Sequence, residues 1–345
     1  MFRVATLFLA PWHLLQVFTQ SSAFVGNTVI GSPRLNGYGL HRWRVRVAAA
    51  MAGRRRRALA GRLSEADRAF FDANGYVEKR DFLPAAMFEA LRRDMLDYRG
   101  EAREMVQGDT ITRRLAVDPA MLAAVPGLAG LVRDRGWRGL VRYAGSHDAE
   151  PLIYVQTIIT DGNGANRDPQ TALHADTFHA TVKAWLFLTD VAAADGTFCY
   201  VPGSHRDTPA RLAWEHRRSL TARDDADRLS ARGSLRVGPD ELAGMGLPPA
   251  RTFAVPANTL IVADTHGFHA RGVATRPSTR IELWAFGRGN PFLPWALPGL
   301  GDIPGIAERR IGWMWRAKDR WARWLGQPWR AVGLKRPGDP ATPGD

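Results

Sequence analysis

Residues 152–188 read LIYVQTIITDGNGANRDPQTALHADTFHATVKAWLFL, and this stretch decides the predicted fold. Residues 152–160 are rich in β-branched and aromatic side chains, and residues 181–188 alternate between two faces. Both patterns predict β-strands. Between them lie a polar, glycine-containing loop at 161–169 and the segment Leu173–His179. The stretch therefore predicts two strands that flank a segment with two histidines.

The sequence on either side of residues 152–188 predicts further strands and helices. Further short strands are predicted at 198–201, 252–255, 259–263 and 279–286, with a helical insertion over 208–246. On the N-terminal side, Ser64 followed by Asp67 predicts the start of a helix that ends near Gly75. A strand at 76–77 and a helix over 84–98 follow. Helices ahead of many short antiparallel strands predict a mainly β fold with flanking helices (α+β), a double-stranded β-helix or jelly roll.

Three segments are expected: a basic extension over 1–60, a jelly-roll domain over 61–290, and a tryptophan-rich basic helix and tail over 291–345. A helix is expected over 40–63, and its run Arg54–Arg57 is interpreted as a solvated face. The stretch 308–332 is expected to be helical. Its tryptophans fit packing onto the barrel or onto a second subunit in a homo-oligomer. The other interpretation is a basic amphipathic helix at a membrane surface or over an acyl-chain groove.

Composition narrows the class of protein. The chain has 345 residues, 45% of them hydrophobic and 23% charged, which is enough for a sizeable core. The single cysteine, Cys199, excludes an intramolecular disulfide and a cysteine-only zinc site. Pro11 interrupts the apolar run at 4–10 before it could span a membrane, so no transmembrane segment is expected. We therefore expect a cytoplasmic protein.

The formal net charge is +13, and nearly all the positive charge is arginine. One interpretation is compositional, because an arginine bias with abundant alanine and glycine is typical of a GC-rich genome. The other is attraction to an anionic partner such as a phosphorylated, CoA-linked or acyl-chain-like small molecule. No nucleic-acid-binding motif accompanies the charge, so we expect no nucleic-acid partner.

The pair His174 and Asp176 carries the first sign of chemistry. Residues i and i+2 of an extended chain point to the same side, so the imidazole and the carboxylate converge. A third ligand is needed, and His269 follows the strand at 259–263, with His266 as a rival in the same turn. Two histidines and one carboxylate form the facial triad of non-haem iron(II) enzymes, which leaves coordination positions open for dioxygen and a co-substrate.

Four other residues are candidates for binding the co-substrate. Arg280 lies eleven positions after His269, at the start of a strand. Its guanidinium can grip a carboxylate in a bidentate fork, and Arg271 is a rival for that role. Lys183 and Gln156 lie within predicted strands and are weaker candidates. A pairing of Arg280 with Glu282, its i+2 neighbour, is the competing structural interpretation.

In this order, His174-x-Asp176, residues 196–205 (GTFCYVPGSH), His269 and Arg280 resemble the phytanoyl-CoA dioxygenase family. The resemblance covers roughly residues 64–290. It implies a jelly roll that binds Fe(II) through His174, Asp176 and His269, with 2-oxoglutarate and dioxygen as co-substrates. It also implies Arg280 as the residue that holds the distal carboxylate of 2-oxoglutarate, and succinate and carbon dioxide as by-products.

Arg271 departs from the family pattern, because the position two after the distal histidine often carries a small residue. Asp176 disfavours halogenation, since related halogenases lack this carboxylate. Hydroxylation of a small-molecule or lipid-like substrate is the expected reaction. Two alternatives stay open at this point: a zinc- or manganese-dependent hydrolase or isomerase with the same ligands, and a non-catalytic jelly-roll binding module.

Overall fold

The computed structural model describes residues 11–162 and 168–343. The apolar run at 4–10, residues 163–167 of the predicted loop and the last two residues of the tail lie outside the described residues.

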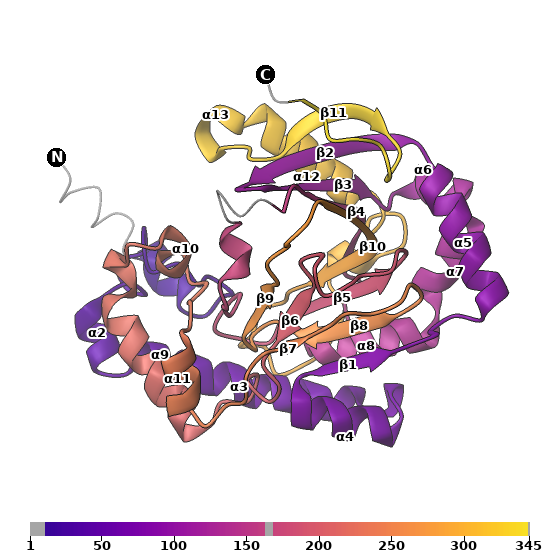
Figure 1. Ribbon diagram of the computed structural model, residues 1–345. Helices are drawn as coiled ribbons and strands as arrows, with labels where there is room; N and C mark the ends of the chain where they lie inside the picture. The colour runs from indigo at the N-terminus through magenta and orange to yellow at the C-terminus, as the bar shows by residue number, and fades with distance from the viewer. Residues whose placement is uncertain (1–10, 163–167, 344–345) are drawn as a thin grey trace.

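Two antiparallel sheets form the centre of the molecule (Figure 1). The large sheet runs in the order β1 (Tyr76–Lys79), β8 (Leu260–Asp264), β5 (Val182–Phe187), β10 (Ser278–Gly287), β4 (Leu152–Thr160), β3 (Thr110–Ala116), β2 (Gly100–Gln107) and β11 (Arg330–Lys335). The small sheet runs β7 (Arg251–Thr252), β6 (Phe198–Tyr200), β9 (His269–Arg271). The predicted α+β jelly roll is confirmed.

The helices lie outside and around these sheets (Figure 1). They are α2 (Pro33–Gly37), α3 (Leu40–Leu59), α4 (Glu65–Asn74), α5 (Ala85–Asp97), α6 (Pro119–Ala124), α7 (Pro126–Arg133), α8 (Arg135–Gly145), α9 (Pro209–Thr221), α10 (Arg228–Ala231), α11 (Pro239–Gly244), α12 (Arg310–Arg320) and α13 (Ala322–Leu325). Short 3-10 turns are η1 (Ala60–Arg62), η2 (Pro169–Thr171), η3 (Ala222–Asp224) and η4 (Leu300–Asp302).

The predicted boundaries of α4 have clear physical causes. Ser64 Oγ accepts a hydrogen bond from the Asp67 backbone N–H at 3.1 Å and so caps the helix start. Gly75 ends the helix with a left-handed φ of 84°, a conformation that glycine adopts without strain. The chain then enters β1 directly, as the sequence predicts.

The large sheet has two different faces. Leu186, Val155 and Leu283 point outward and pack on α5, α7 and α8 in the largest hydrophobic cluster. Trp185 and Trp284 point the other way, where they form a second cluster with residues of the small sheet such as Phe198. Because side chains alternate along a strand, Arg280 and Glu282 lie on the same face as Trp284. That face forms the inside of the jelly roll.

The arginines of α3 correct one expectation. Arg55 is 1% exposed, and its guanidinium donates to the carbonyl oxygens of Ser146 and Pro291, at 2.7 Å and 3.1 Å. Arg56 forms a 2.7 Å ion pair with Asp264 at the end of β8. Arg54 and Arg57 are exposed, so only half of the run is a solvated face. Arg55 and Arg56 therefore tie the N-terminal extension to the rest of the protein.

The C-terminal segment also differs from the expected continuous helix over 308–332. The helices end at Leu325, and residues 330–335 form β11, which extends the large sheet by pairing with β2. Arg103 on β2 is ion-paired with Asp319 on α12, so the segment is fixed at two points.

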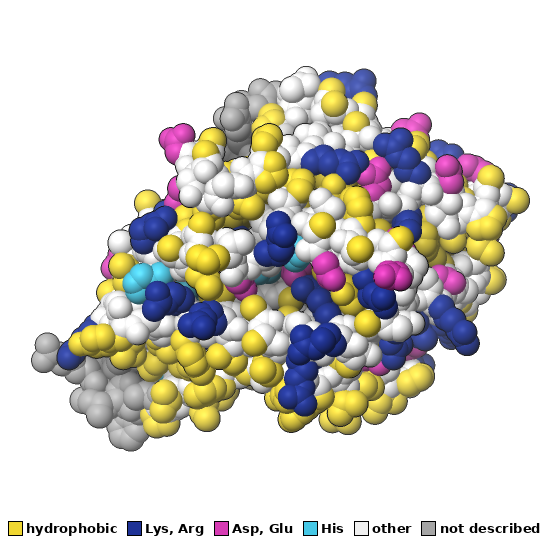
Figure 2. Space-filling view, turned by 90° about the horizontal axis from the view of Figure 1, so that it is seen from below, with side chains coloured by type: hydrophobic (Ala, Val, Ile, Leu, Met, Phe, Trp, Pro, Cys, Tyr) yellow, Lys and Arg dark blue, Asp and Glu magenta, His cyan; other side chains and the backbone are white. Residues whose placement is uncertain are grey.

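On the face shown in Figure 2, which is seen from below, the basic side chains do not form one extended stripe. Basic side chains (dark blue) are scattered there among hydrophobic ones (Figure 2). No helix within residues 11–162 and 168–343 has both the length and the apolar character needed to cross a bilayer.

Candidate metal centre

Backbone pairing brings the two predicted ligand segments together. His174 and His269 form an isolated antiparallel bridge, with the N–H of each donating to the carbonyl of the other at 3.0 Å and 2.9 Å. The Asp176 N–H donates to the carbonyl of Thr265 at 2.9 Å. Backbone hydrogen bonds alone thus hold His174 and His269 side by side, although they are 95 positions apart in the chain.

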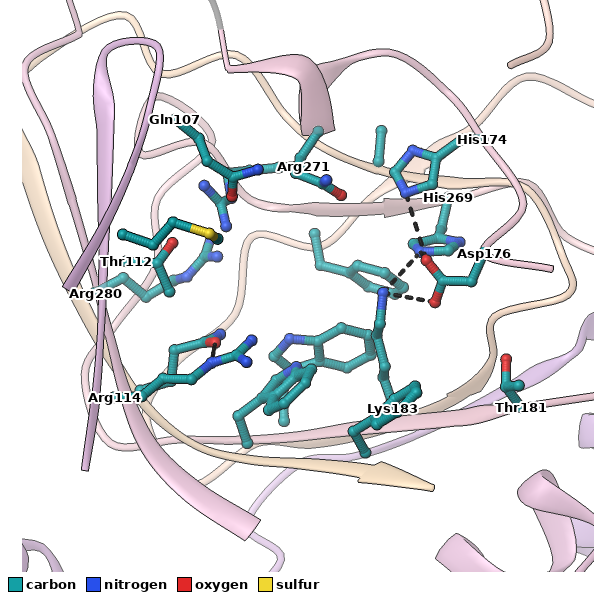
Figure 3. A pocket seen from close by; sticks show the side chains of 18 of the residues that line it. Gln107, Thr112, Arg114, His174, Asp176, Thr181, Lys183, His269, Arg271 and Arg280 are labelled. Atoms are coloured by element: carbon teal, nitrogen blue, oxygen red, sulfur yellow. Dashed lines mark hydrogen bonds and ion pairs between the residues drawn. The ribbon is translucent and has the colours of Figure 1, made fainter. Parts of the chain in front are cut away.

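The three predicted ligand side chains converge on one point (Figure 3). Asp176 Oδ1 lies 3.7 Å from His174 Nε2 and 3.5 Å from His269 Nε2. All three ligand atoms lie within 4.8 Å of one another. Separations of this size fit three ligands that each bind one ion at about 2.0–2.2 Å.

Each imidazole is oriented through its other ring nitrogen. His174 Nδ1 lies 2.7 Å from the carbonyl oxygen of Ala172, and His269 Nδ1 lies 3.0 Å from that of Gly267. A carbonyl only accepts, so Nδ1 carries the proton and Nε2 keeps its lone pair for a metal. Gly267 itself cannot be larger, because a Cβ there would lie 1.9 Å from the buried Tyr200 Oη.

Burial and nearby charge favour the metal-binding protonation states. Burial, followed by the neighbouring His269, holds the pKa of His174 well below its usual range, so the ring is neutral. Burial alone would raise the pKa of Asp176, but the charge of Lys183 and the contacts with His269 outweigh this effect. The pKa of this carboxyl therefore lies well below its usual range, and the group is ionised.

The rival ligand His266 is engaged elsewhere. Its Nδ1 lies 2.9 Å from the carbonyl oxygen of Thr177, and its Nε2 lies 3.0 Å from Asp207 Oδ1. Burial would lower its pKa, but the charge of Asp207 overcomes this and raises it. Both nitrogens thus have protein partners. His179, the other histidine of the 173–179 segment, has its Nδ1 at 3.0 Å from the carbonyl oxygen of Ala180.

A pocket with a cavity volume of about 440 Å³ opens beside the three ligands. All four predicted binding residues line it: Arg280, Arg271, Lys183 and Gln156. Its walls also carry aromatic side chains, namely Trp185, Phe198, Trp284, Phe286 and Trp329. Apolar walls with a few polar groups are typical of small-molecule sites.

The predicted binding residues have strong protein partners. Arg280 Nε lies 2.9 Å from Glu282 Oε2, which is the predicted competing pair, and its Nη1 donates to the carbonyl of Gly196. Arg271 is ion-paired with the buried Asp168. Gln156 links the set, since its Nε2 donates to Glu282 Oε1 at 2.7 Å.

Lys183 lies closest to the ligands. Its Nζ is 2.6 Å from Asp176 Oδ2 and 3.4 Å from His269 Nε2. An ammonium this near the ligand atoms would repel a divalent ion. The lysine has a flexible four-carbon stem and borders the open pocket, so it can move its charge away when an ion binds. The donor set of two imidazoles and one carboxylate fits iron(II), given that movement.

Three of the pocket residues that the sequence-based prediction did not assign to the site carry a charge or a large ring. Arg114 on β3, Arg288 after β10 and Trp329 before β11 all line the pocket. Thr112 and Arg114 alternate with Ile111 and Arg113, which is a weak strand signal. Nothing local to Trp329 indicates that it approaches β3.

A model of the phytanoyl-CoA dioxygenase family matches residues 71–235, a range that includes His174 and Asp176 and ends before His269. No curated protein matches the chain.

Several solved structures are similar at low identity. The non-haem α-ketoglutarate-dependent epimerase SnoN from nogalamycin biosynthesis is 20% identical over 65% of this chain and 82% of that chain, with a TM-score of 0.43. HygX from Streptomyces hygroscopicus, with nickel and 2-oxoglutarate bound, is 17% identical over 66% and 87%, with a TM-score of 0.41. EctD from S. alaskensis with bound Fe is 16% identical over 72% and 85%, with a TM-score of 0.39.

The family match includes the His-x-Asp pair, which lies at the mouth of a jelly-roll pocket beside a second histidine. Residues 71–235 of the chain match the phytanoyl-CoA dioxygenase family.

Proposed function

We propose that this protein is an iron(II)- and 2-oxoglutarate-dependent dioxygenase that hydroxylates a small organic substrate. The observation that carries the proposal is the convergence of His174 Nε2, His269 Nε2 and an Asp176 oxygen within 4.8 Å at a pocket mouth. In the balanced reaction, substrate, dioxygen and 2-oxoglutarate give hydroxylated substrate, succinate and carbon dioxide. Bound iron would supply the activation of dioxygen.

The residues of the chain then have distinct tasks. His174, Asp176 and His269 would hold the ion, and the hydrogen bonds at Nδ1 keep both imidazoles in the binding tautomer. The adjoining pocket would hold 2-oxoglutarate and dioxygen. The aromatic walls exclude water from the reacting centre.

Arg280 is the residue that we assign to the distal carboxylate of 2-oxoglutarate. It points into the jelly roll from β10, and Glu282 and Gly196 engage its Nε and Nη1. These contacts fix the orientation of the guanidinium and leave N–H groups for the ligand. Arg271 is bound to Asp168, whose side chain is fully buried, and is less available.

The deciding experiment is an anaerobic titration of the purified protein with ferrous iron and 2-oxoglutarate, followed in the visible region. The proposal expects a charge-transfer band that saturates at one iron per chain, and succinate release once air is admitted. His269→Gln is the matched variant and should give no band.

Two other results would assign a different function. Tight zinc or manganese binding without a band or succinate would favour a hydrolase or isomerase that uses the same ligands. Failure to bind any divalent metal would favour a non-catalytic binding module. Either result contradicts the proposal.

A further inference from the structure

We propose that the substrate carries an oxyanion, bound by Arg114 between Trp284 and Trp329 across the pocket from the metal ligands. This inference rests on the proposed function, and it names the class of substrate. The close-up view places Arg114 on the side of the pocket opposite His174, Asp176 and His269 (Figure 3).

Arg114 has unused hydrogen-bonding capacity. Its Nε donates to Gln156 Oε1 at 2.8 Å, and Gln156 in turn donates to Glu282. Within the described part of the chain, its two Nη groups have no hydrogen-bond partner and no carboxylate lies within 4.0 Å. A guanidinium carries five N–H donors, so most of those of Arg114 remain free for a ligand at the pocket wall.

Aromatic rings hold this guanidinium in place. Its Cζ lies 4.0 Å from the ring centroid of Trp284, 4.6 Å from that of Trp329 and 5.1 Å from that of Tyr154. These rings stabilise the cation through their faces and do not use its N–H groups. A fixed, partly desolvated guanidinium with free N–H groups is suited to bidentate binding of a carboxylate, phosphate or sulfate.

The net positive charge of the pocket also favours an anionic substrate. Its described lining carries five cationic side chains and one acidic side chain: Arg114, Lys183, Arg271, Arg280 and Arg288, against Asp176. Asp168 and Glu282 pair with Arg271 and Arg280, which makes five positive charges against three negative ones. Ferrous iron and doubly charged 2-oxoglutarate cancel each other. Two positive charges are left for the substrate to balance.

The unbalanced charges belong to particular residues. Arg280 is assigned to 2-oxoglutarate, Arg271 is paired with Asp168, and Lys183 lies on Asp176. Arg114 and Arg288 are the lining cations that lack an ion pair among the described residues. Arg288 donates to the backbone carbonyl of Gln20 and has no aromatic box. Arg114 is therefore the better-built anion site.

The same walls define the rest of the substrate. Phe286, Trp185 and Phe198 line the same pocket, and a cavity of about 440 Å³ must also hold 2-oxoglutarate. The expected substrate is thus a compact molecule with an apolar or aromatic body and one oxyanion group. Anchoring the anion at Arg114 would turn the body toward the metal.

Matched probes test the proposal. Protein loaded anaerobically with Fe(II) and 2-oxoglutarate, with loading read from the visible band, is dialysed against phenylacetate, phenylacetamide, phenyl phosphate and phenyl sulfate. We expect at least one of the anions to bind about tenfold or more tightly than the neutral amide, as charge-assisted hydrogen bonds require. The ranking of the three anions identifies which oxyanion the site prefers.

Arg114→Gln should reduce the anion preference to less than about threefold and leave the midpoint of the iron and 2-oxoglutarate titration unchanged. Arg288→Gln is the matched control and should keep the preference. Trp329 directly precedes the edge strand β11. Trp329→Ala removes one ring of the box, so it should weaken the binding of the anions more than that of the amide. This variant decides the matter if Arg114→Gln does not melt cooperatively.

Three results would overturn this inference. The wild type could bind the anions and the amide equally, or it could bind none of the probes. The preference for anions could also survive in both Arg114→Gln and Trp329→Ala. A missing visible band in the wild type would instead overturn the proposed function. The two failures are therefore distinguishable.

Discussion

Arg280 and Glu282 form an ion pair inside the jelly roll, with Nε 2.9 Å from Oε2 and both side chains almost fully buried. The pair ends a chain of polar contacts that starts at Arg114 and runs through Gln156 to Glu282 and Arg280. In the proposed function, the carboxylate of 2-oxoglutarate joins Glu282 as a second anion on this arginine.

Glu282→Gln should lower the melting temperature of the free protein, because it leaves the buried Arg280 without a counter-ion. Removing one partner of a buried pair costs about 3–5 kcal/mol. Added 2-oxoglutarate with Mn(II) supplies a new anion and should raise the melting temperature of the variant more than that of the wild type. Calorimetry with and without ligand measures both effects, and equal ligand shifts would contradict the assignment of Arg280.

Arg280→Lys should weaken 2-oxoglutarate binding about tenfold or more, since lysine loses the bidentate fork. Arg271→Lys is the matched comparison, because Arg271 lines the same pocket. The half-saturation concentration of 2-oxoglutarate in the charge-transfer titration is the measurement. A larger effect from Arg271→Lys would transfer the role to Arg271.

His269→Gln should abolish stoichiometric binding of Fe(II) or Mn(II), whereas His266→Gln should retain it. The reason is that both ring nitrogens of His266 have protein partners. Equilibrium dialysis with metal analysis gives the stoichiometry, and circular dichroism checks that both variants are folded. Loss of metal only in the His266 variant would mean that the wrong histidine has been assigned.

Lys183→Met should bind Mn(II) more tightly than the wild type in the absence of 2-oxoglutarate, because the ammonium lies 2.6 Å from Asp176 Oδ2 and opposes a divalent ion there. Isothermal titration calorimetry measures this change in Mn(II) affinity. The change should be smaller at high salt if the Lys183 ammonium is accessible to solvent ions. Weaker metal binding by the variant would show that Lys183 supports the ligands and does not compete with the ion.

The stability of the protein should fall as the pH is lowered from 6.5 toward 3. Burial, with smaller effects from Arg55 and Arg56, lowers the pKa of His147 from 6.5 to about 3. In this window the unfolded chain binds a proton that the folded state excludes, so acid favours unfolding. The free energy of unfolding, measured with urea, should be lower at pH 5 than at pH 7. This loss should be about 1–2 kcal/mol smaller in His147→Gln than in the wild type. An unchanged difference would contradict this.

Much of the fold was predictable because its signals are local. The strand at 152–160 matches β4 at both ends, and the cap at Ser64 fixed α4. The ligands His174, Asp176 and His269 were also predicted together, and the structure brings them within 4.8 Å. Their roles remain predictions until metal binding is measured.

The strands β2 and β3 were not predicted, because their stabilising contacts come from distant segments. Arg113 is fully buried, yet its sequence context is polar. It is satisfied by an ion pair with Glu104 and by the carbonyl oxygens of Arg336, Pro337 and Asp339. Since those carbonyls lie more than 220 residues away in the chain, no window of sequence around Arg113 contains the information.

The C-terminal strand β11 was not predicted, for a similar reason. The stretch 308–332 was expected to be helical, but the helices end at Leu325 and residues 330–335 pair with β2. Strand pairing over such a separation depends on the partner, not on the segment. The anion site at Arg114 was missed with it, because one of its rings is Trp329.

The position of Trp329 has a consequence for biosynthesis. A ribosome delivers this residue sixty positions after His269, which at about 5–20 residues per second means a delay of several seconds. During that interval the nascent chain already contains the three proposed metal ligands but lacks one ring of the aromatic box around Arg114. Trp329 is thus the last of the described pocket residues to be synthesised.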